Sequence, residues 1–156
     1  MDREQRTSLN YFFVNVFNQI LSWEENSFKE MGLSDLSLRE LHVIEAVCYL
    51  KGMGKNRMSD IAKYLSITPG SLTTSVNTLV KKGYLEREND KDDRRVVLIV
   101  PKDGAEKVNT LHAGFHSAMI DEVEKIVNNE EIDVLVKTLE KLSVFFGEKS
   151  KVRGRK

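Results

Sequence analysis

Apolar residues recur at helical spacing near the start of the chain and spread over more than one face of the helix that they predict. Between Thr7 and Lys29 these positions follow a period of about 3.6 residues. Tyr11 and Trp23 widen the apolar stripe further. A terminal helix of this kind needs a second partner, and a second copy of the chain is the simplest one. We therefore expect a homodimer through the first and last helices, with an interface that includes Phe12, Phe13, Val16, Phe17 and Phe146.

The next segments with apolar residues at helical spacing predict two further helices. Gly32 is a typical helix-stop residue, so the first helix is expected to end before it. Ser37 and Glu40 have the spacing of a capping box, which predicts a helix from there to about Leu50. A loop with two glycines separates this helix from a short one expected over residues 58–65.

Another helix is expected after a turn of only three residues. Thr68 is a favourable N-cap and Pro69 suits the first helical position. Gly83 marks the end of this helix. Two short helices joined by a tight turn form a helix-turn-helix unit.

A run of β-branched and aliphatic residues then replaces the helical spacing and predicts a hairpin. Residues 84–87 and 96–100 are the expected strands, with the charged stretch 88–95 between them. Residues 101–104 are expected to turn the chain into a long helix that ends near Val127. Asn129 is expected to cap a final helix.

Together these elements predict a mainly α (α+β) fold, built as one unit of 156 residues. A winged helix-turn-helix over residues 35–103 lies between the helices of a dimerisation domain, residues 1–34 and 104–148. A basic tail, residues 149–156, follows. The hydrophobic fraction of 40% and the charged fraction of 31% are those of a globular protein.

The amino-acid composition limits the cellular compartment and the kinds of molecule that the protein is expected to bind. The single cysteine, Cys48, excludes an internal disulfide and favours a reducing cytoplasm, and we expect it to be buried and inert. The charged N-terminus does not resemble a signal peptide, and no stretch approaches the ~20 apolar residues of a membrane-spanning helix. Lys+Arg and Asp+Glu balance at 24 each, whereas nucleic-acid-binding proteins are often basic overall. For contact with phosphates, the position of the basic residues matters more than the net charge of the chain. Basic residues do cluster at 81–82, 94–95 and in the tail.

The polar face of the helix expected over residues 69–82 is the most informative surface. It carries small hydroxyl and amide side chains and no carboxylate, opposite an apolar arc. Such side chains bond base edges and phosphates, whereas a solvated surface helix, the alternative interpretation, usually carries Glu and Lys. We assign DNA contacts to Gly70, Ser71, Thr73, Thr74, Asn77, Thr78 and Lys81.

The expected hairpin tip offers a second contact with DNA. Arg94 and Arg95 lie there, and an arginine side chain can enter a narrow minor groove. Asp93 is placed to hold Arg95 by a charge-assisted hydrogen bond. The alternative is an ordinary charged turn, in which neighbours such as Asp90 and Asp92 repel phosphate.

The segments Ile61-Ala62, Gly83-Tyr84-Leu85-Glu86-Arg87 and Asp93-Arg94-Arg95 resemble the winged helix of the MarR family of bacterial transcriptional regulators. The resemblance covers essentially the whole chain. It implies a homodimeric repressor, without catalytic activity, that binds a pseudo-palindromic DNA duplex. Pro101 departs from the pattern, since the family usually has Thr before the turn into the long helix.

A narrower resemblance is to the fatty-acid-synthesis repressors of Gram-positive bacteria. It rests on the segments Leu38-Arg39-Glu40-Leu41-His42, Gly70-Ser71-Leu72-Thr73-Thr74-Ser75, Arg94-Arg95-Val96-Val97 and Leu111-His112 with Phe115-His116. It implies repression of type II fatty-acid-synthesis genes, with long-chain acyl groups on acyl carrier protein as corepressor. We expect an effector pocket beneath the helix-turn-helix that contains Trp23, His42, His112, Phe115 and His116.

The histidines carry a competing interpretation. His112 and His116 are four residues apart, the spacing that presents two imidazoles to one metal ion. With Glu24 and His42 they resemble the site of the zinc-uptake repressors of the same family, although a cysteine of a second site in those relatives is missing here. The other interpretations are histidines that bond one another or line the effector pocket, with no cofactor required.

Other functional classes are disfavoured or left open. The sequence has no glycine-rich phosphate loop, nucleophile motif or acid pair of an enzyme. A winged helix that binds a protein instead of DNA would need neither Arg95 nor the free Ser/Thr face. A different small hydrophobic effector remains an alternative to the acyl group and to zinc.

Overall fold

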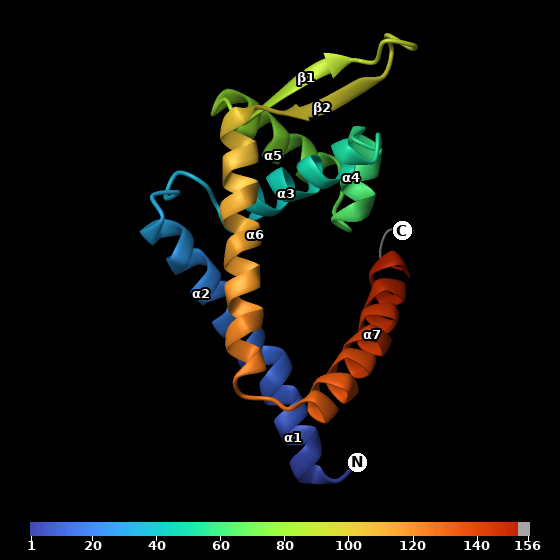
Figure 1. The fold of residues 1–156 in the computed structure, drawn as a ribbon. Coiled ribbons are helices and arrows are strands. Elements are labelled where there is room, and N and C mark those ends of the chain that lie inside the picture. The colour runs from blue at the N-terminus through green and yellow to red at the C-terminus, as the bar shows by residue number, and fades with distance from the viewer. Residues whose placement is uncertain (153–156) are drawn as a thin grey trace.

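The computed structural model describes residues 1–152, with side chains to Lys149, and places a small winged head on long helices (Figure 1). The N-terminal helical segment consists of α1 (Arg3–Tyr11), the π-helical turn η1 (Phe12–Val16) and α2 (Phe17–Glu30). The head contains α3 (Leu38–Gly52), α4 (Met58–Tyr64), α5 (Pro69–Lys81), β1 (Leu85–Asn89) and β2 (Val97–Pro101). The chain then follows α6 (Asp103–Glu124) and α7 (Asn129–Val152). The predicted winged helix-turn-helix between terminal helices is confirmed.

The hydrophobic core lies in the head, around α3. This helix contacts α4, α5, α6 and β2, so it is covered from several sides. Its inward residues Leu41, Ile44 and Val47 are at most 1% exposed. They pack in one cluster with side chains of the other head elements, including Ile61, Leu72, Val76, Leu79, Leu85 and Ile99. The recognition surface on α5 therefore stands on a rigid support.

Local capping signals fix the starts of two head helices as predicted. Ser37 and Glu40 form both hydrogen bonds of a capping box at the start of α3. The Thr68 side chain accepts the backbone N–H of Ser71 at the start of α5. Gly83 has a φ of +82°, the left-handed conformation that ends a helix at little cost for glycine.

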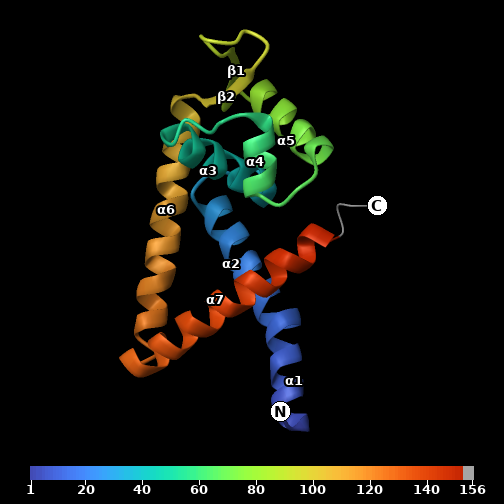
Figure 2. The same ribbon diagram turned by 90° about the vertical axis from the view of Figure 1, so that its right-hand side faces the viewer.

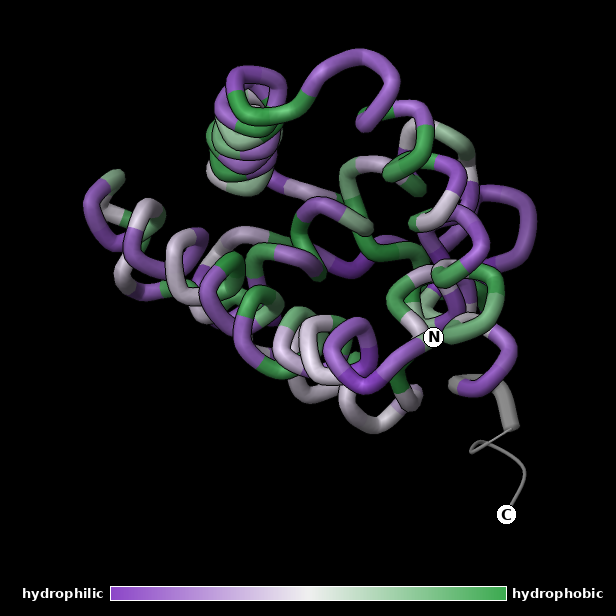
Figure 3. The backbone as a smooth tube through the Cα atoms, turned by 90° about the horizontal axis from the view of Figure 1, so that it is seen from below, coloured by the Kyte–Doolittle hydropathy of each residue, from purple (hydrophilic) through white to green (hydrophobic). Residues whose placement is uncertain are grey.

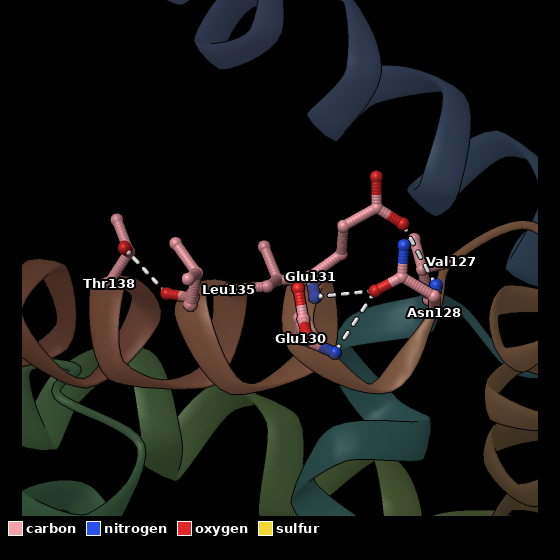
Figure 4. A pocket seen from close by; sticks show the side chains of 7 residues that line it. Val127, Asn128, Glu130, Glu131, Leu135 and Thr138 are labelled. Carbon is pink, nitrogen blue, oxygen red and sulfur yellow. Dashed lines mark hydrogen bonds between the residues drawn. The ribbon is translucent and has the colours of Figure 1, made fainter.

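Two predicted boundaries after the wing are wrong by one or more residues. Pro101 belongs to β2 and pairs with Leu85, since an edge strand tolerates a residue without an N–H. The long helix α6 therefore begins at Asp103. At α7 the cap is Asn128 and not Asn129, because the Asn128 side chain accepts the backbone N–H groups of Glu130 and Glu131, both at 3.0 Å (Figure 4).

The wing is a two-stranded antiparallel hairpin anchored to the loop before α4. Leu85 pairs with Pro101 at its base and Asn89 with Val97 near its tip. Asn56, only 6% exposed, donates its side-chain N–H to the Ile99 carbonyl at 2.8 Å, and its own carbonyl accepts the Ile99 N–H at 2.9 Å. Asn56 was not singled out in the sequence, although the structure makes it the residue that ties the wing to the head.

The terminal helices leave much apolar surface uncovered within one chain. Figure 2 shows α7 crossing the N-terminal helices as a separate arm, and from below hydrophobic turns occur at the periphery as well as in the interior (Figure 3). Phe13 and Phe146 stack edge-to-face at 5.6 Å. Phe17 is 56% exposed and Phe146 is 48% exposed. Over residues 1–152 no helix has the length and apolar character needed to cross a membrane.

The basic tail lies mostly beyond the described residues. Lys149 is in the last turns of α7, with its ammonium 5.6 Å from the centre of the Phe145 ring. Arg153, Arg155 and Lys156 fall outside the part of the chain that the structure describes.

Candidate DNA-binding surface and effector site

The polar face of α5 points away from the core. Leu72, Val76 and Leu79 are fully buried on one side of the helix. The assigned DNA-contact residues lie exposed or half-buried on the opposite side: Gly70, Ser71, Thr73, Thr74, Asn77, Thr78 and Lys81. The hydroxyls of Thr73 and Thr74 donate to carbonyls four residues earlier in the helix, and their oxygen atoms remain available as acceptors. The helix thus presents a carboxylate-free surface of hydroxyl and amide groups.

Two arginines outside α5 hold polar side chains of this face. Arg39 on α3 donates from Nη1 to Ser71 Oγ at 2.8 Å. Arg87 on β1 donates from Nη2 to Asn77 Oδ1 at 2.6 Å. Neither arginine was assigned to this surface from the sequence, because each contact forms only when separate elements fold together. Both guanidinium groups add positive charge beside the recognition helix.

The wing tip presents Arg95 to solvent on a folded loop. The Asp90 carboxylate accepts the backbone N–H groups of Asp92 and Asp93, and these hydrogen bonds lower the pKa of Asp90. Asp93 accepts the backbone N–H of Arg95 at 3.0 Å, whereas its carboxylate lies 4.0 Å from Arg95 Nε. The Arg95 side chain is 95% exposed. Asp93 therefore shapes the backbone more than it holds the guanidinium, which stays free to extend into a groove.

A partly buried ion pair fixes the C-terminal end of the recognition helix to α3. Lys82 Nζ lies 2.9 Å and 3.0 Å from the two carboxylate oxygens of Glu40 and also donates to the Asp35 carbonyl. Burial raises the pKa of Glu40, but hydrogen bonds from Ser37 and Lys82 outweigh it and leave that pKa below its ordinary value. Lys82 is consequently engaged with Glu40 and Asp35, while Lys81 lies exposed on the face of α5 assigned to DNA contact.

Replacing Glu40 by glutamine should lower the free energy of unfolding by about 1–3 kcal/mol, because Lys82 loses its charged acceptor in a partly buried ion pair. The pKa of Glu40 is depressed in the folded state, so its contribution is complete above the unfolded pKa and is lost as the pH falls through the folded value. The difference in thermal midpoint between the parent and Glu40→Gln should therefore shrink on acidification. The exposed Glu140→Gln serves as the control, and an equal effect there would contradict this role.

Glu24 is the centre of a cluster with the three histidines, in which Glu24 and His112 are buried and His42 and His116 are partly exposed. Its side chain comes from α2 and is 4% exposed. Its Oε1 lies 2.7 Å from His112 Nε2, 3.2 Å from His42 Nε2 and 3.9 Å from His116 Nε2. His112 and His116 approach each other at 3.1 Å between their Nε2 atoms. The structure thus brings together all four residues that the sequence proposed as metal ligands.

Three of these residues, Glu24, His42 and His112, have ligand atoms spaced closely enough to share one tetrahedral metal ion. Ligand atoms at about 2.0–2.1 Å from a tetrahedral ion lie roughly 3.3 Å from one another, within the observed spread. Ligand atoms of Glu24, His42 and His112 all lie within 4.8 Å of one another. His112 Nδ1 makes no hydrogen bond among the described residues, but it lies 3.5 Å from Glu45 Oε2. A carboxylate in this place is the usual outer partner of a metal-bound histidine.

In the predicted effector pocket Phe115 is buried, whereas Trp23 is 46% exposed. Trp23 and Phe115 stack edge-to-face at 5.3 Å, and Phe28 fills the space beside Phe115 and His112. A cavity of about 290 Å³ includes His42, but not Trp23 or Phe115, in its lining. It is lined by Leu21, Leu38, Arg39, His42, Val43, Leu65 and Ile67. The sequence did not indicate the other lining residues, since the aliphatic ones are equally typical of a core and Arg39 is equally typical of a solvated surface.

A wider hollow of about 700 Å³ lies where α6 turns into α7, lined by residues 127–138 (Figure 4). It contains neither the histidines nor a residue of the head. Its position on the uncovered arm makes it part of the apolar surface described above. We therefore do not assign it to an effector.

Cys48 behaves as an inert thiol. It is half-buried on α3, and burial raises its pKa to about 11. Because the thiolate is the reactive form, a raised pKa makes this residue a poor redox sensor.

Comparisons with known proteins place this geometry among DNA-binding regulators. The MarR family model matches residues 36–97, which contain the helix-turn-helix and most of the wing. Streptococcus pneumoniae FabT, solved in complex with DNA, is 32% identical, with a TM-score of 0.80 over 92% of this chain and 98% of that chain. The S. aureus MepR–DNA complex shares the fold, at 18% identity and a TM-score of 0.73 over 88% of this chain and 97% of that chain.

A curated relative supports the same assignment. The HTH-type transcriptional regulator YcgE of Bacillus subtilis is 27% identical over 109 residues, which are 67% of each protein. These relatives are transcriptional regulators and not enzymes, and in a helix-turn-helix the second helix is the one that enters the major groove of DNA. The chain belongs to the MarR family of DNA-binding transcriptional regulators.

Proposed function

We propose that this regulator is a homodimeric repressor of fatty-acid-synthesis genes, with acyl groups on acyl carrier protein as its corepressor, acting in the cytoplasm. The observation that carries the proposal is the similarity to S. pneumoniae FabT along nearly the whole chain, at 32% identity. The short segments that resemble fatty-acid-synthesis repressors agree with it. These segments lie in α3, α5, the wing and α6, which carry the candidate DNA-binding surface and the candidate effector site.

The homodimer is supported by the uncovered apolar side chains of the terminal helices. Val134, Val144, Phe145 and Phe17 are each at least half exposed in the single chain. A soluble monomer rarely leaves so much contiguous apolar surface in water. A second copy packed on these helices buries it, and a two-fold axis presents two recognition helices about 34–36 Å apart to a pseudo-palindromic duplex.

The cavity beside His42 is the proposed acyl site. Its lining is mainly aliphatic, which suits a hydrocarbon chain, and Arg39 and His42 supply hydrogen-bond donors for the carbonyl end. A volume of about 290 Å³ is at the lower end of small-molecule sites. A corepressor acts there only if it binds the DNA-competent arrangement of the two recognition helices more tightly than the alternative.

A zinc-responsive repressor is the second candidate, favoured by one observation: Glu24, His42 and His112 present ligand atoms within 4.8 Å of one another. His116, whose side chain is 41% exposed and whose Nε2 lies 3.9 Å from Glu24 Oε1, is the proposed fourth ligand. A zinc ion would join α2, α3 and α6 at the base of the head. Its binding would require neutral imidazoles and an ionised Glu24.

Operator binding separates the two candidates. Under the acyl proposal, long-chain acyl carrier protein raises the affinity of the parent for operator DNA, and a chelator changes nothing. Under the zinc proposal, a chelator removes a gain in affinity that zinc restores, and His116→Ala or the double change His112→Ala with His116→Ala abolishes it. Because His112 is buried, the exposed His116 gives the cleaner single variant. Indifference to all three additions would reject both effectors and leave the family assignment intact.

A further inference from the structure

Arg39 belongs to two surfaces at once. It lies in the first turn of α3, and its side chain lines the cavity of about 290 Å³ beside His42. The same guanidinium donates to Ser71 Oγ at 2.8 Å on the recognition helix α5. A single side chain therefore connects the interior of the cavity with a residue assigned to DNA contact.

The cavity touches the helix-turn-helix as well as its support. Leu65 and Ile67 line it from the turn between α4 and α5, whereas Leu21 lines it from α2. Between the two turn residues, Ser66 has a φ of +54°, a conformation that residues other than glycine rarely adopt. An occupant would thus contact the turn that orients α5, directly beside Arg39.

We propose that Arg39 transmits occupancy of this cavity to the recognition helix. The inference rests on the proposed function, because the occupant is taken to be an acyl group whose chain fills the aliphatic part. The carbonyl oxygen of the acyl group accepts a hydrogen bond from Arg39, and the guanidinium turns from Ser71 toward the ligand. The Ser71 hydroxyl is then available to a base edge or a phosphate.

The chemistry of arginine suits this exchange. A guanidinium group carries five N–H donors in a rigid fork and stays charged at every relevant pH, so it can move between acceptors without a change of charge. Arg39 is an exposed residue, and its reorientation therefore requires no repacking of the core. The direction agrees with a corepressor, since release of Ser71 adds a contact with DNA. Arg39 acts here as a positioning residue.

Arg87 provides a matched control within the same molecule. It also donates from a guanidinium to a polar side chain of α5, Asn77, at 2.6 Å. It is not among the residues that line the cavity. Loss of either arginine removes one positive charge and one hydrogen bond beside α5, but only Arg39→Ala also breaks the connection to the cavity.

The test compares operator affinity with and without ligand for the parent, Arg39→Ala and Arg87→Ala. The probes are long-chain acyl carrier protein, the same carrier without an acyl group, and the free fatty acid, which separates a thioester carbonyl from a carboxylate. We expect the acylated carrier to raise the affinity of the parent by a factor of about 5–150, the usual range of coupling between two sites. For Arg39→Ala the factor should fall below about two, while Arg87→Ala keeps the parent's factor.

Each outcome of these titrations either supports or overturns the role proposed for Arg39. If Arg39→Ala retains the parent's factor, or if Arg87→Ala loses it equally, the inference is overturned and the proposed function stands. If the parent itself ignores every acyl probe, the acyl function and the inference both fail. A simple phosphate contact by Arg39 would lower the slope of log affinity against log salt by about one and leave the ligand factor unchanged. If alanine lowers the thermal midpoint, Arg39→Gln, which keeps most of the side-chain length, serves in the same comparison.

Discussion

A glutamate in place of Phe17 is expected to convert the protein from a dimer into a monomer and to weaken operator binding by a factor of about 10²–10⁴, since joint binding of two half-sites is lost. Phe17 lies on α2 with 56% of its surface exposed in the single chain. In a two-fold dimer the substitution introduces two charges into an apolar interface, which is strongly unfavourable. Light scattering at micromolar concentration measures the mass, and duplex titration measures the affinity.

Gln19→Glu is the control for this experiment. Gln19 lies two residues further along α2 and is exposed and polar, so a negative charge there should leave the dimer intact. A parent that is monomeric, or a Phe17→Glu variant that remains dimeric and binds operator normally, would show that these helices do not form the interface.

Replacement of Arg95 by alanine should weaken operator binding by about tenfold, the effect of losing one good contact of 1–3 kcal/mol. The thermal midpoint should hardly change, because the Arg95 side chain is 95% exposed and makes little contact with the core. Affinity for operator and for unrelated DNA, compared at equal salt, provides the measurement.

Two further substitutions show whether α5 and the wing act differently. Ser71→Ala or Thr74→Ala should alter the preferred sequence, because these residues lie on the face opposite the buried side of α5. Lys91→Ala near the wing tip should reduce affinity less than Arg95→Ala. Unchanged binding by Arg95→Ala would remove the wing from the DNA interface.

Local signals predicted the head helices well because their ends depend on neighbouring residues. The Ser37–Glu40 capping box and the Thr68 cap form as expected. The π-helical turn η1 and the place of Pro101 in β2 were not predictable, since they depend on packing and on strand pairing. The shift of the α7 cap to Asn128 shows how two adjacent asparagines offer equivalent local signals.

The sequence predicted some parts of the candidate sites and not others, because some depend on local spacing and others on tertiary packing. Helical spacing and the relation between helices brought Glu24 and the histidines together, as the sequence suggested. The cavity that the structure shows shares His42 with the predicted effector pocket, but its other lining residues depend on packing, as does the contact between Phe28 and Phe115. The contacts of Arg39 and Arg87 with α5 were missed because exposed long side chains find their partners only after folding.

The DNA sequence that the protein selects tests its central role most directly. Purified protein is mixed with a library of random-sequence duplexes, and the bound fraction is sequenced over several rounds. A two-fold dimer that reads DNA through α5 and the wing should enrich an inverted repeat whose half-site centres lie about one helical turn apart, roughly 10–10.5 base pairs. No enrichment, or enrichment of a single asymmetric half-site, would contradict the account.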